Sequence, residues 1–398
     1  MQITKTAYNS VLLAQWKADA LTPEMISKKL SEFLGMFTKT FNNSTQIKNA
    51  AVYIKGLLCN LKRKSIEPIA LEHMGESGVR TLQNFITRST FEDEKVLGFY
   101  QEQLARAING TNGMLSIDGS DFPKKGKNSV AVKRQYCGRL GKVENCQACV
   151  FAAYASDVGY GIVDRELYFP KEWFDDEHEE LRKKCQVPDD KEFKTKNEIA
   201  LDMINKTMAQ NIFEIKWIGC DGAFGCDHDF IDALPKTAYY FAAVKKNERV
   251  FLPDSDVPQT VESLAKDNSF TWETVGFEGS KGTLYSDIKI IRCFSCRSVK
   301  NTPVCRDEIW LYIRRYHNGD TRYFLSNAPS DISHDQLHEA ATLRWPIEQC
   351  FEECKTELGM ADFEGRSYKG FLRHLLFVMI AHFFGTSLRL ELKKTTSP

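Results

Sequence analysis

The sequence has no net charge, because 53 lysines and arginines are balanced by 53 aspartates and glutamates. A whole-chain charge of zero points to neither a nucleic-acid nor a membrane partner, so only local charge clusters can indicate one. The first residues lack the basic start, apolar core and small-residue cleavage site of a secretion signal. Internal repeats and low-complexity segments are also missing. We therefore expect a cytoplasmic globular protein.

A long hydrophobic run is missing as well. The most apolar stretch, LLFVMIAHFF at residues 375–384, is too short to cross a bilayer and indicates a buried helix. The twelve cysteines, without a secretion signal, favour reduced thiols. One Cys-X-X-Cys pair, Cys146 and Cys149, falls in a predicted strand, where residues three apart point to opposite faces. Buried thiols are the interpretation we prefer there, and a zinc site is the alternative.

The length of 398 residues is typical of two or three domains. Residues 1–108 have helical apolar spacing, and residues 109–245 alternate short apolar strands with helices, which predicts an α/β core. Residues 246–320 are rich in strand patterns without helices between them, so we expect a β-rich insertion. Residues 321–398 return to the core and are mostly helical.

Two short apolar segments end in the same way, with an aspartate followed by glycine. LSIDG contains Asp118 and WIGCDG contains Asp221, and each segment has the pattern of a strand. Carboxylates at the ends of neighbouring core strands commonly hold divalent ions, and Mg²⁺ prefers oxygen ligands. Asp-Gly is also ordinary turn chemistry. The residues alone leave a metal site and a solvated turn as alternatives.

A third carboxylate lies in a predicted helix within LRWPIEQCFEECKTELGMADFEGRS. Pro346 suits the first helical position and places Glu348 in the first turn. Lys355 is seven residues later, on the same helical face. Glu352 shares that face and is the rival third carboxylate, and a helix with surface charge pairs would explain the stretch too. Arg344, just before the helix, is either a phosphate contact or a surface charge.

Residues 122–143 form a basic segment that contains no Asp or Glu and includes Tyr136. A local cluster of this kind suits contact with nucleic-acid phosphates. A solvated loop is the alternative. The basic residues are Lys124, Lys125, Lys127, Lys133, Arg134, Arg139 and Lys142.

These motifs resemble those of the DDE transposases of bacterial insertion sequences, in particular the insertion sequence 701 group, which is related to the insertion sequence 4 group. The resemblance rests on IDGSDFPKKGKNSVAVKRQYCGRLGKVENCQ, CDGAFG and LRWPIEQCFEECKTELGMADFEGRS. It extends to the N-terminal part through YIKGLLCNLKRKSIEPIA and TLQNFITRSTFEDEKV, and so covers most of the chain. It implies an α/β fold with an RNase H-like catalytic core, a β-rich insertion before the last acidic residue and an N-terminal helical domain.

The resemblance also implies an acidic triad of Asp118, Asp221 and Glu348. This triad would bind two Mg²⁺ ions, for which Mn²⁺ can substitute, and the ions would activate the attacking water or 3′-hydroxyl and stabilise the leaving oxygen. Asp118 would contact both ions, and the other two carboxylates would each complete one of them.

The wider group has a signature of Tyr, two residues, Arg, three residues, Glu, six residues and Lys. Arg344, Glu348 and Lys355 fit this signature, which favours Glu348 over Glu352 as the third acid. Arg344 and Lys355 would neutralise or position strand phosphates. Ala341 stands at the tyrosine position, so this sequence departs from the signature there. We therefore do not expect this chain to perform whatever that tyrosine does for a DNA intermediate.

By the same resemblance, we expect a transposase that cleaves and transfers strands of double-stranded DNA. The helical region, residues 1–108, would bind the terminal inverted repeats, and the protein would act as a homodimer on terminal and target DNA. The expected place is the bacterial cytoplasm, with the nucleoid when DNA is bound, and no membrane. The expected DNA contacts are Lys124, Lys125, Lys127, Lys133, Arg134 and Arg139.

Three other functions remain as alternatives at this point. One is a transposase-derived protein that binds DNA without activity, which the intact triad disfavours. Another is a metal-dependent nuclease without strand transfer. The third is a glycoside hydrolase in which Asp221 and Glu348 serve as acid and base, an interpretation that the lysine-rich segment disfavours.

Overall fold

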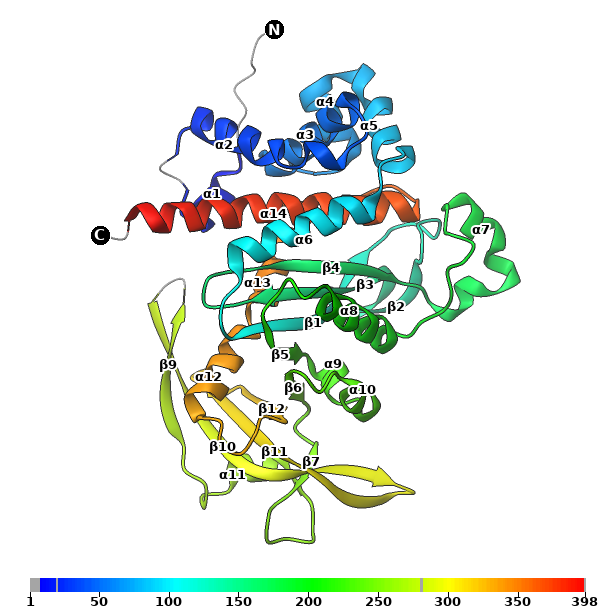
Figure 1. Ribbon diagram of the computed structural model, residues 1–398. Coiled ribbons are helices and arrows are strands. Elements are labelled where there is room, and N and C mark those ends of the chain that lie inside the picture. Colours follow the sequence, from blue (N-terminus) through cyan, green and yellow to red (C-terminus); the bar gives the residue numbers. More distant parts are fainter. Residues whose placement is uncertain (1–7, 19–20, 280–281, 397–398) are drawn as a thin grey trace.

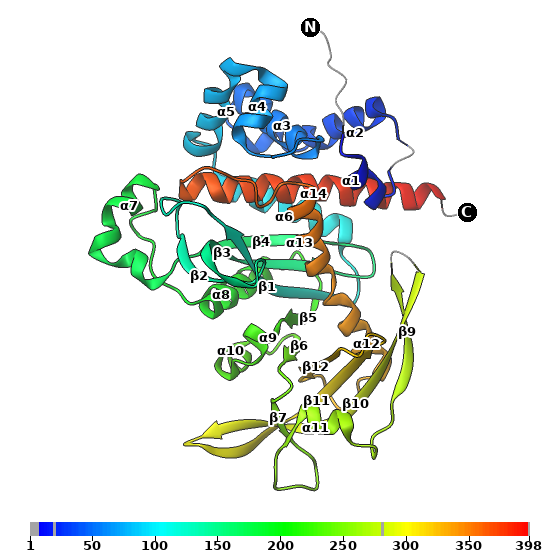
Figure 2. The same ribbon diagram turned by 180° about the vertical axis from the view of Figure 1, so that it is seen from behind.

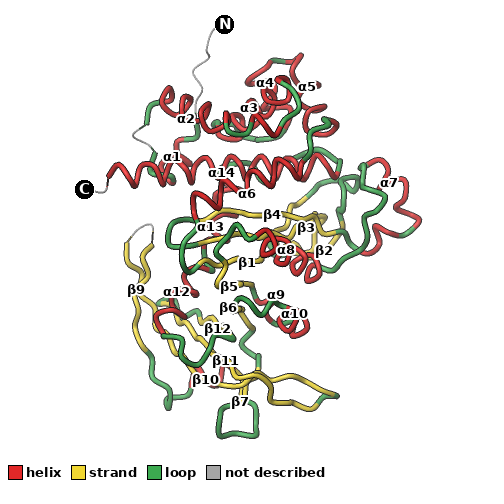
Figure 3. Tube along the Cα trace, in the orientation of Figure 1, coloured by secondary structure: helices red, strands yellow, loops and turns green. Residues whose placement is uncertain are grey.

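The computed structural model describes residues 8–18, 21–279 and 282–396. Figure 1 and Figure 2 show helices at one end of the molecule, an α/β layer next to them and a β-rich region at the opposite end. Figure 3 shows the same division by secondary structure. The long C-terminal helix α14 (Tyr368–Thr396) runs between the N-terminal helices and the α/β layer.

The first part of the chain is helical, as the apolar spacing predicts. Its helices are α1 (Ser10–Gln15), α2 (Pro23–Gly35), α3 (Ser44–Leu58), α4 (Ile66–Met74), α5 (Glu76–Arg88) and α6 (Asp93–Ile108), with a 3₁₀ turn at Thr38–Thr40. Three of them begin after a side chain that accepts hydrogen bonds from the first turn: Asn9 for α1, Thr22 for α2 and Asn43 for α3. Aromatic contacts such as Phe85 with Phe377 join these helices to α14.

Five strands form the centre of the α/β layer. They are β1 (Gly113–Pro123), β3 (Lys142–Ala155), β4 (Tyr160–Tyr168), β5 (Ile215–Cys220) and β6 (Tyr239–Val244). Their order in the sheet is β4-β3-β1-β5-β6. Strand β3 is antiparallel to both β4 and β1, whereas β5 and β6 run parallel to β1. This order and these directions are those of an RNase H-like core, so the predicted fold class is confirmed.

Strand β3 is buried continuously from Cys146 to Ala155, which requires that both faces of the sheet are covered. Helix α8 (Lys196–Gln210) packs against β3 and β4 from one side. Helices α13 (Pro346–Thr356) and α14 pack against the same strands from the other side, as a comparison of Figure 1 with Figure 2 shows. A layered α/β core of this kind was expected from the alternation of strands and helices.

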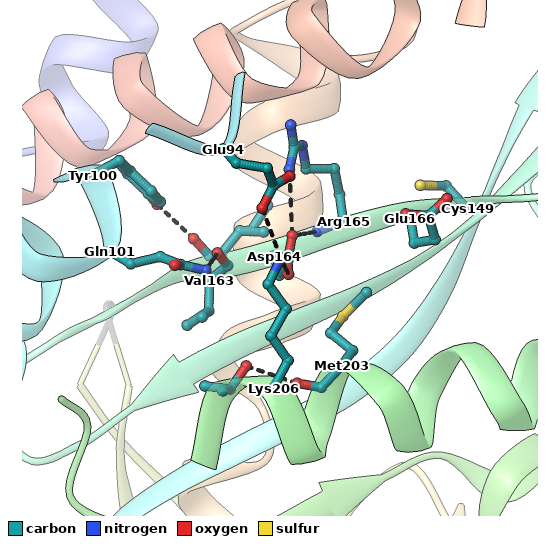
Figure 4. A network of polar contacts seen from close by, with 12 residues as sticks. Glu94, Tyr100, Gln101, Cys149, Val163, Asp164, Arg165, Glu166, Met203 and Lys206 are labelled. Carbon is teal, nitrogen blue, oxygen red and sulfur yellow. Dashed lines mark hydrogen bonds and ion pairs between the residues drawn. The ribbon is translucent and has the colours of Figure 1, made fainter. Parts of the chain in front are cut away.

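The pairing of β3 with β4 slips by one residue at Val163, which forms a β-bulge. A bulge leaves backbone groups without a partner in the ladder, and helix α6 supplies the partners. Gln101 donates a hydrogen bond to the carbonyl of Val163, at 3.1 Å, and the Tyr100 hydroxyl donates to the carbonyl of Ile162 (Figure 4). These bonds fix α6 on the sheet.

Two buried charged residues, Asp164 and Arg165, follow the bulge. The Lys206 ammonium from α8 lies 3.5 Å from an Asp164 oxygen and 2.9 Å from an oxygen of Glu94 on α6 (Figure 4). Arg165 is 3.3 Å from the other Asp164 oxygen. Because buried charges are tolerated only when paired, this network holds α6, β4 and α8 in one arrangement.

The insertion between β6 and the last acidic helix is rich in strands, as predicted. It contains β7 (Arg249–Phe251), β8 (Gln259–Thr260), α11 (Val261–Lys266), β9 (Glu273–Gly279), β10 (Gly282–Val299) and β11 (Thr302–Tyr316). The expectation of no helix in this block is wrong, because Thr260 accepts a hydrogen bond from the Ser263 N–H and starts α11. Strand β12 (Thr321–Ser326) then pairs with both β11 and β6, so the insertion continues the core sheet.

Helix α14 is long and apolar enough to cross a membrane by length and composition alone. However, 72% of its most apolar window is buried inside the protein. The stretch 375–384 is buried throughout, so the prediction of a buried helix there is confirmed. The remaining elements are β2 (Lys133–Cys137), 3₁₀ turns at Lys171–Phe174 and Asp176–His178, α7 (Glu179–Lys184), α9 (Gly222–Gly225), α10 (His228–Ala233) and α12 (His334–Leu343).

Candidate active site

Asp118 and Asp221 lie side by side because their strands are paired. Strands β1 and β5 are parallel neighbours, and Ile117 is in register with Cys220. The next residue on each chain is therefore one of the two aspartates, at strands that run roughly 4.8 Å apart. Asp221 also accepts hydrogen bonds from the N–H groups of Ala223 and Phe224, at 3.0 and 3.3 Å, which fixes its side chain at the start of α9.

Glu348 approaches the same place from helix α13. Pro346 is the first residue of that helix, and Glu348 lies in its first turn, as predicted. The Arg344 guanidinium binds the Glu348 carboxylate and lies 3.9 Å from an oxygen of Asp118. All three carboxylates and Arg344 line one cavity of about 520 Å³. The structure therefore brings together residues that are far apart in the sequence.

The electrostatics of this cavity are dominated by its three carboxylates, which are only partly buried. Burial and the neighbouring Asp221 carboxylate raise the pKa of Asp118 to about 7, although Arg344 acts in the opposite direction. Two acidic groups that repel each other in a poorly solvated cavity form a site for positive charge. Arg344 supplies part of that charge.

The carboxylates form oxygen-donor pairs that suit divalent ions of the Mg²⁺ type. Within the described ranges of the chain, no group of three or more His, Cys, Asp or Glu side chains is close enough to hold a single ion. A two-ion arrangement needs pairs instead, and Asp118 can form one pair with Asp221 and another with Glu348. The donor chemistry of these carboxylates thus suits a divalent cation.

Lys355 lies on α13 beside this cavity but does not line it. Its ammonium is 5.0 Å from the centre of the Phe351 ring, and burial together with the nearby Arg139 lowers its pKa. Asp118 and Asp121 act in the opposite direction. Lys355 therefore lies between the carboxylates of Asp118 and Asp121 and the Arg139 guanidinium of the basic segment.

The turn between β2 and β3 carries Arg139 to this position. The N–H of Gly138 donates a hydrogen bond of 2.8 Å to Asp121, which follows Asp118 on strand β1. Because Asp121 holds the turn, Arg139 is next to Lys355 on the catalytic side of the sheet. Asp121 was not identified from the sequence, since its role depends on a turn that is distant in the chain.

The residues predicted to contact DNA differ in their exposure and in whether their side chains already have a partner. Lys125, Lys127 and Arg134 are exposed, as is Arg139. The Lys124 ammonium instead donates a hydrogen bond of 2.6 Å to the carbonyl of Phe363, and burial lowers its pKa to about 8.

Lys133 is also engaged, in an ion pair of 2.5 Å with Glu172. Both Lys124 and Lys133 thus have structural partners. A second cavity of about 700 Å³ lies over this loop, where Arg63 and Arg366 join Lys125.

Several residues of the 520 Å³ cavity were missed by the sequence analysis. Arg314 and Tyr316 reach it from β11 of the insertion, and Arg322 from the neighbouring strand β12. Their alternation in the sequence marks one face of a strand, but nothing in the sequence shows which cavity that face meets. Trp345 lines the cavity and is 56% exposed. Ala341 also lines it, so the missing tyrosine of the signature is missing from this cavity wall.

The structure decides between the alternatives for Glu352 and for the cysteines. Glu352 is exposed and does not line the cavity. All twelve cysteines are free, and both Cys146 and Cys149 are buried, as expected for structural thiols. Among residues 8–18, 21–279 and 282–396, no cluster of three or more His, Cys, Asp or Glu side chains could hold a zinc ion.

Comparison with known proteins identifies the family. A family model described as "DDE superfamily endonuclease" matches residues 36–266, and a second, "Transposase DDE domain", matches residues 184–384. The chain belongs to the DDE transposases. It is 27% identical over 326 residues to a probable transposase for insertion sequence element IS701 from Microchaete diplosiphon, which covers 79% of this chain and 75% of that protein. This transposase is therefore similar over most of its length to one of the insertion sequence 701 group, and its family excludes the glycoside hydrolase alternative.

A solved structure, the NurA nuclease from Sulfolobus solfataricus, aligns with 67% of this chain and 82% of its own. The identity is 11% and the TM-score is 0.27, so this likeness carries no weight for the fold or the function. The assignment of this transposase as an enzyme that acts on DNA rests on the family models.

Proposed function

We propose that this transposase binds the terminal inverted repeats of its own element and catalyses metal-dependent cleavage and transfer of DNA strands. The observation that carries the proposal is the meeting of Asp118, Asp221 and Glu348 in one cavity beside the basic loop. The middle of strand β1, the residue after strand β5 and the first turn of helix α13 deliver these carboxylates from distant parts of the sequence. Such an arrangement costs stability through repulsion, and a cation-dependent reaction gives it a purpose.

In this proposal Asp118, Asp221 and Glu348 hold two Mg²⁺ ions, and Mn²⁺ can replace them. When bound, the ions supply the charge that activates the attacking hydroxyl and stabilises the leaving oxygen. Arg344 keeps the Glu348 carboxylate in place and offers its guanidinium to a strand phosphate. Lys355 and Arg139 extend this positive surface along the strand.

In this proposal each region of the chain has a role on the DNA. Residues 1–108 form the helical DNA-binding region, residues 109–245 and 321–398 the catalytic core, and residues 246–320 the insertion. The basic segment contacts phosphates of terminal or target DNA through Lys125, Lys127, Arg134 and Arg139. Lys124 and Lys133 also contact the duplex after they leave their present partners, Phe363 and Glu172. The protein works as a homodimer on DNA in the bacterial cytoplasm, at the nucleoid.

The substitution Asp221→Asn tests the catalytic part of this proposal. Asparagine keeps the size of the side chain and an oxygen that can cap α9, so folding should change little. It removes the charge that holds a divalent ion, so Mg²⁺-dependent nicking should fall by several orders of magnitude. Binding of the same DNA should stay near the wild-type level.

The assay uses labelled duplexes from the two flanks of the gene, with nicking and gel-shift measured on the same samples. Asp229→Asn is the matched control, because Asp229 is exposed on α10 away from the cavity. A joined product between a labelled 3′ end and a plasmid distinguishes strand transfer from simple nuclease activity. Nicking by the Asp221 variant at the wild-type rate would refute the assignment of Asp221 as an ion ligand.

A further inference from the structure

The pair α4 and α5 forms a compact helix–turn–helix unit in the N-terminal region. A single residue, Gly75, separates the two helices, and its φ of +74° is a conformation that favours glycine. The helices approach closely just after the turn, because a Cβ on Gly78 would lie 2.2 Å from the Cβ of Met74. Two glycines thus hold α4 and α5 in one fixed arrangement.

The inner face of α5 is anchored firmly. Leu82, Phe85 and Ile86 are buried, and the Phe85 ring stacks on Phe377 of α14 with centroids 5.7 Å apart. The guanidinium of Arg373, also on α14, donates hydrogen bonds to the carbonyls of Phe85 and Ile86. The orientation of α5 is therefore fixed, and so is the direction in which its outer face points.

The outer face of α5 is polar and has no partner within the described chain. Ser77, Arg80, Asn84 and Arg88 are exposed and follow one another at intervals of three or four residues, so they form one row along the helix. No hydrogen bond or ion pair within the described ranges engages the side chains of Arg80, Asn84 or Arg88. After the carboxylate of Glu76 in the first turn, this helix has no further acid.

We propose that α5 is the helix that reads base pairs of the terminal DNA, with Arg80 and Asn84 facing base edges in the major groove. This proposal rests on the proposed function and assigns its sequence recognition to one helix face. Arginine forms bidentate hydrogen bonds with guanine and asparagine with adenine, whereas Arg88 at the far end of the row suits a phosphate. An α-helix fits the major groove, and a helix–turn–helix presents its second helix there.

The surroundings of α5 agree with a duplex as its occupant. The connection between α3 and α4 lines the 700 Å³ cavity through Arg63, beside Lys125 and Arg366 of the core. Three acids, Glu144, Asp362 and Glu364, line it too, and Glu364 pairs with Arg63, so Lys125 and Arg366 are its basic groups most open to a phosphate. Contacts of this connection fix it to the core, since the Lys64 N–H donates a 2.9 Å hydrogen bond to Asp362. Helix α4 begins at Ile66, three residues after Arg63, so a duplex bound at Lys125 and Arg366 would lie next to the α4–α5 pair.

The experiment is a selection of bound duplexes with a randomised central segment, made with the purified full-length protein. We expect the wild type to enrich one motif. The variant Arg80→Ala/Asn84→Ala should lose about ten- to one-hundred-fold discrimination at neighbouring base pairs of that motif. Alanine is a strong helix former, so α5 should persist, and thermal unfolding followed by circular dichroism checks this.

Two further variants separate base reading from charge. Arg80→Lys keeps the positive charge but not the bidentate geometry, so it should lose discrimination at one base pair while the salt dependence of binding stays unchanged. Arg106→Ala removes one charge near the far end of α6, about 20 Å along that helix from α5, and should enrich the wild-type motif.

An unchanged motif with Arg80→Ala/Asn84→Ala, or no motif with the wild type, would overturn the assignment of α5. The two proposals fail separately. If Asp221→Asn abolishes nicking while the α5 variant keeps the motif, the catalytic proposal stands and the α5 proposal falls. If the motif changes while Asp221→Asn still nicks, the reverse holds.

Discussion

Glu353 is a buried acid on the helix that carries Glu348, but it faces the opposite way. Its oxygens accept hydrogen bonds from the Tyr160 hydroxyl at 2.9 Å and pair with His382 of α14 at 2.7 Å. Arg389 donates a hydrogen bond to the same tyrosine hydroxyl. Burial opposes ionisation of Glu353, yet the bond to His382 and the charges of His382 and Arg389 outweigh it and lower its pKa to about 2.

This lowered pKa predicts a particular acid sensitivity. The stabilisation from ionised Glu353 is complete above its ordinary pKa of 4.5 and is lost as the pH falls toward 2, because the folded protein must then take up a proton against its preference. The full effect is about 3 kcal/mol. Glu353→Gln should therefore show a flatter dependence of the urea unfolding midpoint on pH between pH 5 and 2, while Glu352→Gln keeps the wild-type slope. Equal slopes for wild type and Glu353→Gln would contradict this.

At the residue scale, the sequence predicts what depends on local context. Asp221 directly follows strand β5, as its apolar run before a glycine predicts. The expectation that Asp118 also closes a strand is wrong, because β1 continues to Pro123 in its pairing with β3. The two aspartates still meet, since β1 and β5 are parallel neighbours. Glu353 could not be foreseen, because its burial depends on Tyr160 and His382 from other elements. The partner of Lys124, Phe363, is equally distant in the sequence.

At the scale of elements, the basic segment, residues 122–143, forms a surface on which only some of the positive side chains are exposed to a DNA phosphate. Lys125, Lys127 and Arg134 are exposed, so they are the charges most ready to bind phosphates. Replacing all three by alanine should weaken binding to every DNA sequence alike. The salt dependence of binding should flatten by about one unit of slope per lost phosphate contact.

The control for this prediction is Lys183→Ala/Lys184→Ala on α7, where both lysines already pair with glutamates one turn earlier. It should leave the salt slope near the wild-type value. The measurement is a series of binding isotherms at increasing salt with one duplex of unrelated sequence. A triple variant with the wild-type slope would mean that the loop is only a solvated surface.

Most elements of the core could be predicted because their apolar patterns are strong. The strands around Asp118 and before Asp221, helix α13 from Pro346 and the buried helix over residues 375–384 appear where their patterns predict them. Strand β2 was not predicted, because its residues were interpreted only as a basic segment. Helix α11 was missed because it is short and surrounded by strand patterns. The tight α4–α5 turn at Gly75 also lay outside the prediction, since its consequence depends on the packing of α5 on α14.

At the scale of the whole molecule, one sheet joins the catalytic core to the insertion. Strand β12 pairs with β6 of the core and β11 of the insertion. This continuity brings Arg314, Tyr316 and Arg322 to the wall of the cavity that holds the carboxylates. The insertion thus completes the site. Sequence patterns gave its strand content but not this pairing, which joins segments distant in the chain.

The central claim is that three carboxylates, and no near neighbour, form the ion-binding catalytic site. Glu348 and Glu352 test it most directly, because they are one turn apart on α13 and only Glu348 lines the cavity. We propose to measure Mg²⁺-dependent nicking of the same labelled duplex by Glu348→Gln and Glu352→Gln side by side. The account predicts a loss of several orders of magnitude for Glu348→Gln and a near wild-type rate for Glu352→Gln. Efficient nicking by Glu348→Gln, or loss of nicking in Glu352→Gln alone, would contradict it.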